Sequence, residues 1–430
     1  MISKLKSISL SNWILIGMIL GFLVGLFLNF FVSDHFIKNI ILIDNVFYLG
    51  GTLFIKLMKM LVVPLVFCSI VVGAASISDI RKIGTIGGRT ILIYLITTAL
   101  AVTIALGLGA LIQPGAGLNM VASADVANVT LNQTMTDTIL NMVPDNPFSS
   151  LASGDMLPVI IFGLLIGIIL AKLKEEVSVV TRFFEQTNHI MMELTSLVMK
   201  FAPIGVFCLM AKTFAGLGFE GLLPLGKYII CVLIGLAIQA FIVYPSLLVA
   251  FTRLNPIRFF KKFVSVMFFA FSSSTSNATI PINMEKVSEM GVSPEISSFT
   301  IPLGATINMD GTAIMQGCAV MFAAQAYGMD LTMAGLLTVI FTAVMASIGT
   351  AGVPSVGLVT LTMVFNSVGL PVEAIGIIFG IDHILDMFRT AVNVTGDAIC
   401  TIIVSFQNKA FDIDVFNGKK APETIGIEYE

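Results

Sequence analysis

Two polar stretches in the C-terminal half decide the fold: SSSTSNATIP at residues 272–281 and SIGTAGVPS at residues 347–355. Each interrupts an apolar region, within 259–290 and 333–366, and leaves halves too short to cross a bilayer. Such a break predicts a re-entrant helical hairpin, because backbone at membrane depth must face protein or a water-filled cavity. Taken singly, either stretch also fits an ordinary polar loop.

The two breaks occupy corresponding places in the sequence. Each is followed by a long apolar span that carries polar residues, 297–327 after the first break and 372–405 after the second. Paired interruptions of this kind are typical of inverted repeats in a secondary transporter, whose binding site lies near the middle of the membrane.

The composition of the whole chain indicates a membrane setting. Of its 430 residues, 57% are hydrophobic and 11% are charged, and the mean hydropathy is +0.99. A soluble protein of this composition would expose large apolar patches to water. The net charge of −3 gives no general attraction to nucleic acid. We therefore predict an all-α integral membrane protein and exclude soluble enzymes and nucleic-acid-binding proteins.

Apolar segments of membrane-spanning length define the predicted topology. The eight expected spans are about 13–32, 47–76, 88–113, 156–171, 190–215, 222–251, 297–327 and 372–405. Lys and Arg gather in alternate connections, as they do in cytoplasmic loops. They are absent between Arg89 and Lys172 and between Lys286 and Arg389. This pattern predicts cytoplasmic N- and C-termini in a multi-pass protein of the inner (plasma) membrane.

Four smaller features complete the sequence pattern. Residues 114–155 are polar and read as an external insertion, and the polar tail after Asn408 is expected to be loosely ordered. Gly17, Gly21 and Gly25 repeat every four residues, which permits close helix packing. The five cysteines all lie in apolar stretches and are expected to be buried rather than to form disulfides or bind metal.

The last span carries a stripe of polar side chains. Asp382, Asp386, Arg389, Asn393 and Asp397 fall within an arc of roughly 80° on a helix. Charges inside a membrane are costly, so such residues face a cavity and mark a substrate or ion path. One alternative is a self-neutralising cluster in which Arg389 pairs with Asp382 and Asp386. Three carboxylates against one guanidinium nevertheless leave negative charge for a cation.

A second polar element is TINMDGT at residues 306–312. Asn, Asp and Gly together disfavour a continuous helix, so an unwound turn is expected here. Free carbonyl oxygens at this turn, together with Asp310 and Asp397, would offer hard oxygen ligands. These suit sodium better than a soft metal.

With these residues in view, the sequence resembles the dicarboxylate/amino acid:cation symporters, the glutamate transporter family. The matching motifs are the serine-rich break ending in Ile280-Pro281, NMDGT at 308–312, GTAGVP at 349–354, and DMFRT at 386–390 leading to NVTGD at 393–397. The four motifs occur in order, and the resemblance covers nearly the whole chain.

The resemblance implies a homotrimer of eight-span protomers with two re-entrant hairpins and an elevator-type mechanism. In this chain, 1–80 and 119–218 would form the scaffold and trimerisation domain, and 81–118 and 219–407 the transport domain. The hairpins would cover about 256–290 and 333–366, and 408–430 would be a cytoplasmic tail.

The resemblance also assigns substrate-binding residues. Arg389 would pair with the side-chain carboxylate of an acidic substrate and Asp386 with its amino group, while Asn393 and Thr312 would hold the α-carboxylate. The backbone of the hairpin tips would contribute as well. The full expected set is Ser274, Thr275, Ser276, Thr312, Val353, Gly357, Asp386, Arg389, Thr390 and Asn393.

Three sodium sites follow from the same resemblance. The first set is Gly304, Asn308, Asn393 and Asp397. The second is Thr306, Met309, Ser347, Ile348 and Thr350. The third is Tyr94, Thr97, Thr98, Asn308 and Asp310. No organic cofactor is expected.

Departures from the family pattern bear on specificity. Many members carry a second arginine near the substrate, where this chain has Ser274 or Met387. Gln316 stands where potassium-countertransporting members have glutamate, which argues against potassium coupling. The C4-dicarboxylate branch lacks the aspartate that corresponds to Asp386, so the presence of Asp386 favours a substrate with an amino group.

The sequence thus predicts sodium-coupled symport of aspartate or glutamate. Alternatives are a proton-coupled symporter, a neutral amino acid or cystine symporter, and, in another class, an anion-conducting channel. No nucleophile, base and orienting group occur together, so an enzyme is not expected.

Overall fold

The computed structural model of the protein describes residues 10–32, 42–43, 45–76, 85–118, 120, 140, 143–154, 156–217, 222–349 and 356–421. Over these residues the chain is helical, with one isolated β-bridge between Val292 and Phe411. The predicted all-α class is confirmed for this part of the chain.

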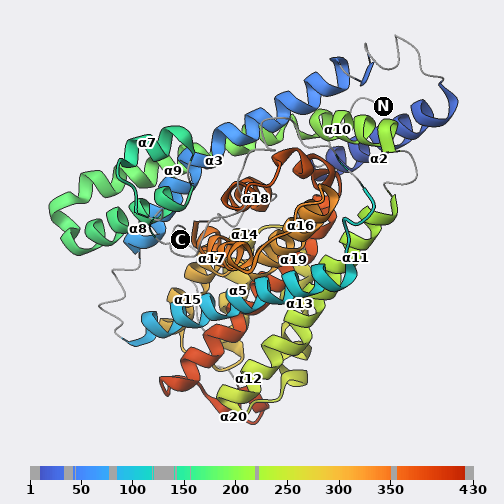
Figure 1. Ribbon diagram of the computed structural model, residues 1–430. Helices are drawn as coiled ribbons and strands as arrows, with labels where there is room; N and C mark the ends of the chain where they lie inside the picture. Colours follow the sequence, from blue (N-terminus) through green and yellow to red (C-terminus); the bar gives the residue numbers. More distant parts are fainter. Residues whose placement is uncertain are drawn as a thin grey trace, which may run out of the picture.

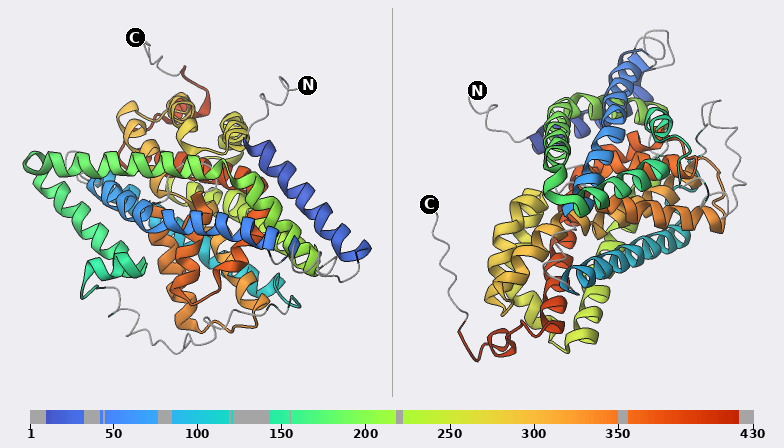
Figure 2. Two further views of the ribbon diagram at one scale, coloured as in Figure 1. Left: turned by 90° about the horizontal axis from the view of Figure 1, so that it is seen from above. Right: turned by 90° about the vertical axis from the view of Figure 1, so that its left-hand side faces the viewer.

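One group of helices forms a layer along one side of the molecule (Figure 1). It consists of α2 (Leu10–Phe31), α3 (Tyr48–Ser76), α7 (Pro147–Ser153), α8 (Met156–Leu173), α9 (Ser178–Met199) and α10 (Ala202–Leu217). α2 packs along α10, and α3 packs on α8, α9 and α10. Seen from above, α8 and α9 meet at a sharp corner at one end of this layer, at the 3₁₀ turn Lys174–Val177 (Figure 2).

A second group of helices surrounds α19 (Ile375–Gln407). They are α5 (Thr85–Ile112), α11 (Leu222–Ile238), α12 (Tyr244–Thr252), α13 (Pro256–Ser273), α14 (Ser276–Glu289), α15 (Pro294–Ile307), α16 (Asp310–Ala326), α17 (Met333–Gly349) and α18 (Val356–Ser367). α19 contacts most of this group and is the axis of the buried core (Figure 1). A polar stripe on α19 is therefore enclosed by protein.

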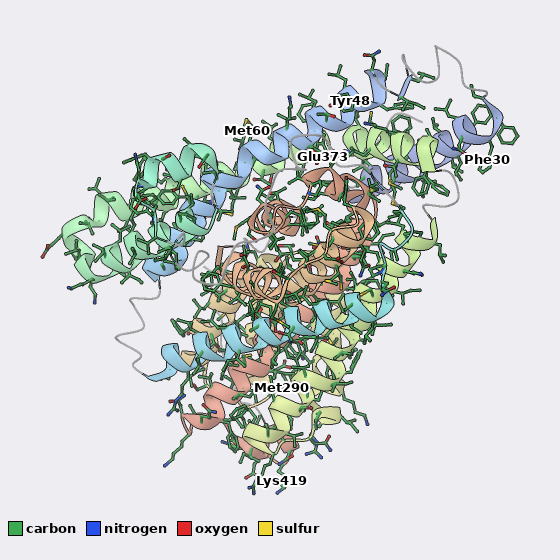
Figure 3. The ribbon with its side chains drawn as sticks, in the orientation of Figure 1. Phe30, Tyr48, Met60, Met290, Glu373 and Lys419 are labelled. Atoms are coloured by element: carbon green, nitrogen blue, oxygen red, sulfur yellow. The ribbon has the colours of Figure 1, made fainter. Side chains whose placement is uncertain are left out.

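A packed helix pair lies where each hairpin is predicted, although residues 350–355, at the tip of the second, lie outside the described residues. α13 packs on α14 around Ser274, and α17 packs on α18. The first pair opens beside the end of α19, where Ser293 N–H donates to the Ala410 carbonyl at 3.1 Å. The second opens beside the start of α19, which is separated from the end of α18 by seven residues. The two hairpins therefore enter the molecule from opposite ends, as Figure 3 indicates by the separation of Met290 and Lys419 from Glu373.

Three described helices are individually long and apolar enough to cross a membrane: 86–112, 223–252 and 384–407. The bent pair 161–199 and 202–216 would add a fourth. The predicted span 190–215 is not one straight helix, because the chain bends by 53° between α9 and α10. Pro203 contributes to the break, since it lacks the N–H that would continue the hydrogen bonding of α9. The count of eight spans stays a prediction.

The glycine repeat of α2 has the predicted packing role. A Cβ at Gly17 would lie 2.4 Å from the Pro203 carbonyl oxygen, and one at Gly21 would lie 2.4 Å from that of Phe207. The two helix backbones are therefore in direct contact. The five cysteines are buried, as expected.

The expectation of a loosely ordered tail is wrong as far as Ala421. Residues 413–417 form α20 (Ile413–Asn417), capped by the Asp412 carboxylate. Phe416 is fully buried, and Lys262 on α13 donates to the Val415 carbonyl at 3.3 Å. The tail is polar in overall composition, but its apolar residues Phe411, Val415 and Phe416 pack against the rest of the protein. The tail thereby covers the open end of the first hairpin.

Candidate substrate and cation site

The unwound turn predicted between residues 306 and 312 is present. α15 ends at Ile307 and α16 begins at Asp310, while Asn308 (φ −92°, ψ 82°) and Met309 (φ −110°, ψ 48°) have non-helical backbone. Gly311, just after the break, lies against α19, where its Cβ would be 2.9 Å from the Arg389 Cα. The break therefore presents Asn308 and Asp310 to the polar stripe of α19.

Asp310 lies at the centre of a buried hydrogen-bond network. Its Oδ1 lies 2.6 Å from the Thr98 hydroxyl and 3.4 Å from that of Thr97. Its Oδ2 accepts hydrogen bonds from Gln239 at 2.9 Å and from the Tyr244 hydroxyl at 2.8 Å. The residues of the third predicted sodium set, with Tyr94 one helical turn away on α5, are thus brought together. All the hydrogen-bond donors that reach this carboxylate from the described residues are neutral.

Asp397 forms the second centre. Its Oδ1 accepts a hydrogen bond from the Asn308 amide at 2.8 Å, and that amide also donates to the Asn393 carbonyl at 3.2 Å. A Cβ at Gly304 would lie 2.5 Å from Asp397 Oδ1 and 2.6 Å from the Tyr94 hydroxyl, so only glycine fits there. The structure thus brings together the residues of the first predicted sodium set.

The Asn308 side-chain oxygen supports a cation ligand role. It is buried and has no hydrogen-bond partner among the described residues. A buried amide oxygen without a donor costs roughly 1–3 kcal/mol, so a ligand that accepts its lone pairs would stabilise it. Hard oxygen ligands of this kind suit sodium.

The second hairpin contacts the unwound turn through Ser347. The Ser347 hydroxyl donates to the Ile307 carbonyl and accepts from the Met309 N–H at 3.1 Å. Ile348 is buried beside it. Three of the residues predicted for the second sodium set, Met309, Ser347 and Ile348, are therefore adjacent.

The other two members of that set are Thr306 and Thr350. The Thr306 side chain is exposed and its hydroxyl donates back to the Leu303 carbonyl at 2.9 Å, so any contribution would come from its backbone. Thr350 lies outside the described residues, as does Val353 of the substrate set.

Arg389 is fully buried and ion-paired twice. Its Nη1 donates to Asp382 Oδ1, and its Nη2 donates to Asp386 Oδ1 at 2.6 Å. This is the self-neutralising arrangement named as the alternative for the polar stripe. The Arg389 Nε and Asp382 Oδ2 nevertheless have no partner among the described residues. An acidic ligand would therefore have to compete for a guanidinium that is already paired.

The other predicted substrate residues surround Arg389. A Cβ at Gly357 would lie 2.7 Å from the Thr312 methyl and 3.8 Å from Arg389 Nη2. Thr390 donates to the Asp386 carbonyl at 2.8 Å, so its hydroxyl is bonded within its own helix. These residues form one buried group from α16, α18 and α19.

The tip of the first hairpin runs alongside the same stretch of α19. The ring of Phe271, near the tip, packs against Phe388 at 4.9 Å between centroids. Ser274 adopts a left-handed conformation (φ 51°) and is buried with Ser276, and Thr275 separates α13 from α14. The arrangement brings the backbone of the tip to the neighbourhood of Arg389.

Asn393 joins the two parts of the site. Its Oδ1 accepts from the Gly311 N–H at 2.7 Å, and its Nδ2 lies 3.3 Å from the Met309 sulfur. It was predicted for both the substrate and the cation sets. The structure makes the two sets one continuous buried region.

The charge balance of this region is negative. Asp310, Asp382, Asp386 and Asp397 are buried, and Arg389 is the only basic side chain that pairs with any of them among the described residues. A buried charge is costly unless it is compensated. The region therefore favours cations.

Two polar residues of the site were missed by sequence reasoning, Gln239 and Tyr244. They are five residues apart, and on an α-helix this separation corresponds to about 140°. They share Asp310 because residues Gln239–Val243 form a π-helical turn. The available signal was Pro245, a helix-disrupting residue beside two polar side chains in an apolar span.

A helix broken at Asn308 and Met309, beside buried charged side chains, is typical of a secondary transporter. A sequence model of the sodium:dicarboxylate symporter family matches residues 10–406, and the chain belongs to this family. The chain is 37% identical to the proton/sodium-glutamate symport protein of Bacillus caldotenax over 93% of this chain and 95% of that protein.

Two further relatives differ in their named substrates. The chain is 35% identical to the proton/glutamate-aspartate symporter of Escherichia coli (strain K12) over 94% of each protein. It is also 35% identical to the human neutral amino acid transporter B(0), over 83% of this chain and 72% of that protein.

Proposed function

We propose that the protein is a sodium-coupled symporter of acidic amino acids, aspartate or glutamate, in the plasma membrane. The observation that carries the proposal is the pair Asp310 and Asp397, buried carboxylates that meet only neutral donors in the described part of the chain, beside the Arg389 group. Sodium bound there would supply the missing positive charge. Binding of substrate and ion would then be linked, because each stabilises the same packed region.

The residues proposed for the substrate are those around Arg389. Arg389 would bind the side-chain carboxylate, and Asp386 the amino group. Thr312 and Asn393 would bind the α-carboxylate, which also suits backbone N–H groups at the two hairpin tips. Their common burial beside Gly357 supports this assignment.

We further propose the family's architecture for this chain. The proposed scaffold, 1–80 and 119–218, would form a homotrimer, and the transport domain, 81–118 and 219–407, would move across it. The separate packing of α2, α3, α8, α9 and α10 supports a division of this kind.

A neutral amino acid is the second candidate substrate, and one contact favours it. Arg389 already pairs with Asp382 and Asp386, which lowers the need for a second substrate carboxylate. The named specificity of the human relative is consistent with this candidate.

Flux measurements in proteoliposomes test the function. With an inward sodium gradient, labelled aspartate or glutamate should accumulate above its external concentration, and proton or potassium gradients alone should not drive accumulation. Accumulation driven by a proton gradient alone would show that the coupling ion is the proton and not sodium. Passive equilibration that ignores every gradient would indicate a channel.

A further inference from the structure

The Asp310 carboxylate is held from two sides by different kinds of partner. Oδ1 faces Thr97 and Thr98 on α5, whereas Oδ2 faces Gln239 and Tyr244 at the α11–α12 junction. All five side chains are fully buried or nearly so. The two oxygens therefore have separate environments.

The threonine side is adaptable. The Thr98 hydroxyl has one hydrogen but two acceptors within reach, Asp310 Oδ1 at 2.6 Å and the Tyr94 carbonyl at 2.8 Å. If this hydrogen turns to the Tyr94 carbonyl, the lone pairs of the hydroxyl become available to a cation. Thr97 has the same choice, with the Tyr94 carbonyl at 3.0 Å. Oδ1 therefore lies on the side where an ion can be bound.

The Gln239 and Tyr244 side is fixed. The Gln239 amide nitrogen donates to Asp310 Oδ2 at 2.9 Å and approaches the Thr97 carbonyl at 3.4 Å. Both neighbours accept only, so the amide cannot flip without losing both bonds. The Tyr244 hydroxyl donates to the same Oδ2 at 2.8 Å. Two donors thus anchor one oxygen and orient the other.

The backbone is shaped to hold these donors. Within the π-helical turn, the Tyr244 N–H bonds to the Gln239 carbonyl, so the two residues lie one turn apart. A Cβ at Gly396 on α19 would lie 2.3 Å from the Tyr244 hydroxyl, so only glycine leaves room for it. π-Helical turns inside α-helices are frequent at functional sites.

We propose that Gln239 and Tyr244 are positioning residues of the cation site: they anchor Asp310 Oδ2 and so direct Oδ1 toward the ion bound with Thr97 and Thr98. This proposal rests on the proposed sodium coupling. Neither residue touches the ion. Loss of either donor lets the carboxylate turn, so the site binds sodium less tightly but still saturates.

The test compares Tyr244→Phe and Gln239→Met with the matched control Tyr228→Phe. Tyr228 is a fully buried tyrosine on α11 whose hydroxyl has no partner among the described residues. The readout is the sodium concentration that gives half-maximal substrate uptake in proteoliposomes, with the maximal rate at saturating sodium.

We expect the half-maximal sodium concentration to rise about tenfold in Tyr244→Phe and in Gln239→Met. The reason is that losing a hydrogen bond to a charged group weakens an equilibrium by about tenfold or more. The half-maximal concentration should stay at the wild-type value in Tyr228→Phe, and saturating sodium should restore the maximal rate. If Tyr244→Phe does not fold, Gln239→Met alone carries the comparison.

Three results would overturn the proposal. These are an unchanged half-maximal sodium concentration in both variants, an equal rise in the control, or a lower maximal rate with unchanged sodium dependence. Absence of sodium dependence in the wild type would instead contradict the proposed function itself, so the two failures are distinguishable.

Discussion

Two pairs of buried carboxylates lie within the site, and they differ in what balances their charge. Asp382 and Asp386 share the Arg389 guanidinium, whereas Asp310 and Asp397 meet only amide and hydroxyl donors among the described residues. The first pair is largely satisfied by the protein, so a ligand there must compete with an existing ion pair. No described basic side chain balances the second pair, which is where we propose that an ion from solution binds.

The largest predicted effect comes from removing Arg389. In Arg389→Cys, uptake of aspartate and glutamate should fall by about 100-fold or more, because the site loses its partner for the second carboxylate. Uptake of small neutral amino acids should persist or increase. Competition of labelled uptake by aspartate and by serine measures both.

Persistence of neutral amino acid uptake also controls for folding of the Arg389→Cys variant. If that variant kept its preference for acidic substrates, the assignment of Arg389 to the substrate carboxylate would be wrong even though the family is right.

A smaller effect is expected at Asp397. Asp397→Asn removes one of the two charges that meet only neutral donors, so substrate affinity should fall and the sodium requirement should rise together. Couplings between linked sites typically amount to about 1–3 kcal/mol, or about 5- to 150-fold. Substrate titrations at several sodium concentrations provide the measurement, and wild-type values of both quantities would contradict cation binding at Asp397.

Asp382→Asn tests the pair of carboxylates that shares Arg389. It removes one of the two carboxylates on Arg389, so an acidic ligand should compete better, and the preference for aspartate over serine should rise about threefold to tenfold. Asp386→Asn is the matched control, because Asp386 is proposed to hold the amino group and its loss should weaken both ligands. A reduced preference in Asp382→Asn would show that Asp382 supports the pocket rather than competing for Arg389.

The smallest effect is expected at the C-terminal tail. Asp412 accepts from Lys420 at 3.1 Å and caps α20 through the N–H groups of Val415 and Asp414. These contacts lower the pKa of Asp412. Since the folded-state pKa is depressed, this contribution is present above the unfolded value of about 4 and is lost as the pH falls through the folded-state value.

Asp412→Ala should therefore increase hydrogen exchange of residues 409–421 at neutral pH, with little change in transport. Asp414→Ala, which removes an exposed carboxylate 3.6 Å from Lys419, is the control and should change little. Equal exchange in both variants would indicate that packing of Phe416 alone holds the tail.

Much of the site could be predicted from the sequence. The break at Ser274 and Thr275 and the turn at Asn308 and Met309 follow from Ser, Thr, Gly, Asn and Asp in apolar surroundings, although residues 276–281 of the predicted first break are helical. The stripe on α19 follows from helical periodicity alone.

Other features depend on contacts that local sequence does not encode. Both Asp382 and Asp386 lie on the face of Arg389, so spacing alone left the pairing open, and the structure shows that both are engaged. Gln239 and Tyr244 meet at Asp310 only because the helix contains a π turn. The order of the tail depends on Phe416, which is buried by residues distant in the sequence.

One measurement tests the central claim most directly, namely the affinity of the purified protein for aspartate and glutamate as a function of sodium concentration. Because no described basic side chain pairs with Asp310 or Asp397, replacing sodium by choline at constant ionic strength should weaken binding by more than about tenfold. Lowering the pH without sodium should not restore it. An affinity that is the same in sodium and in choline, or that protons restore in full, would contradict sodium binding at these two carboxylates.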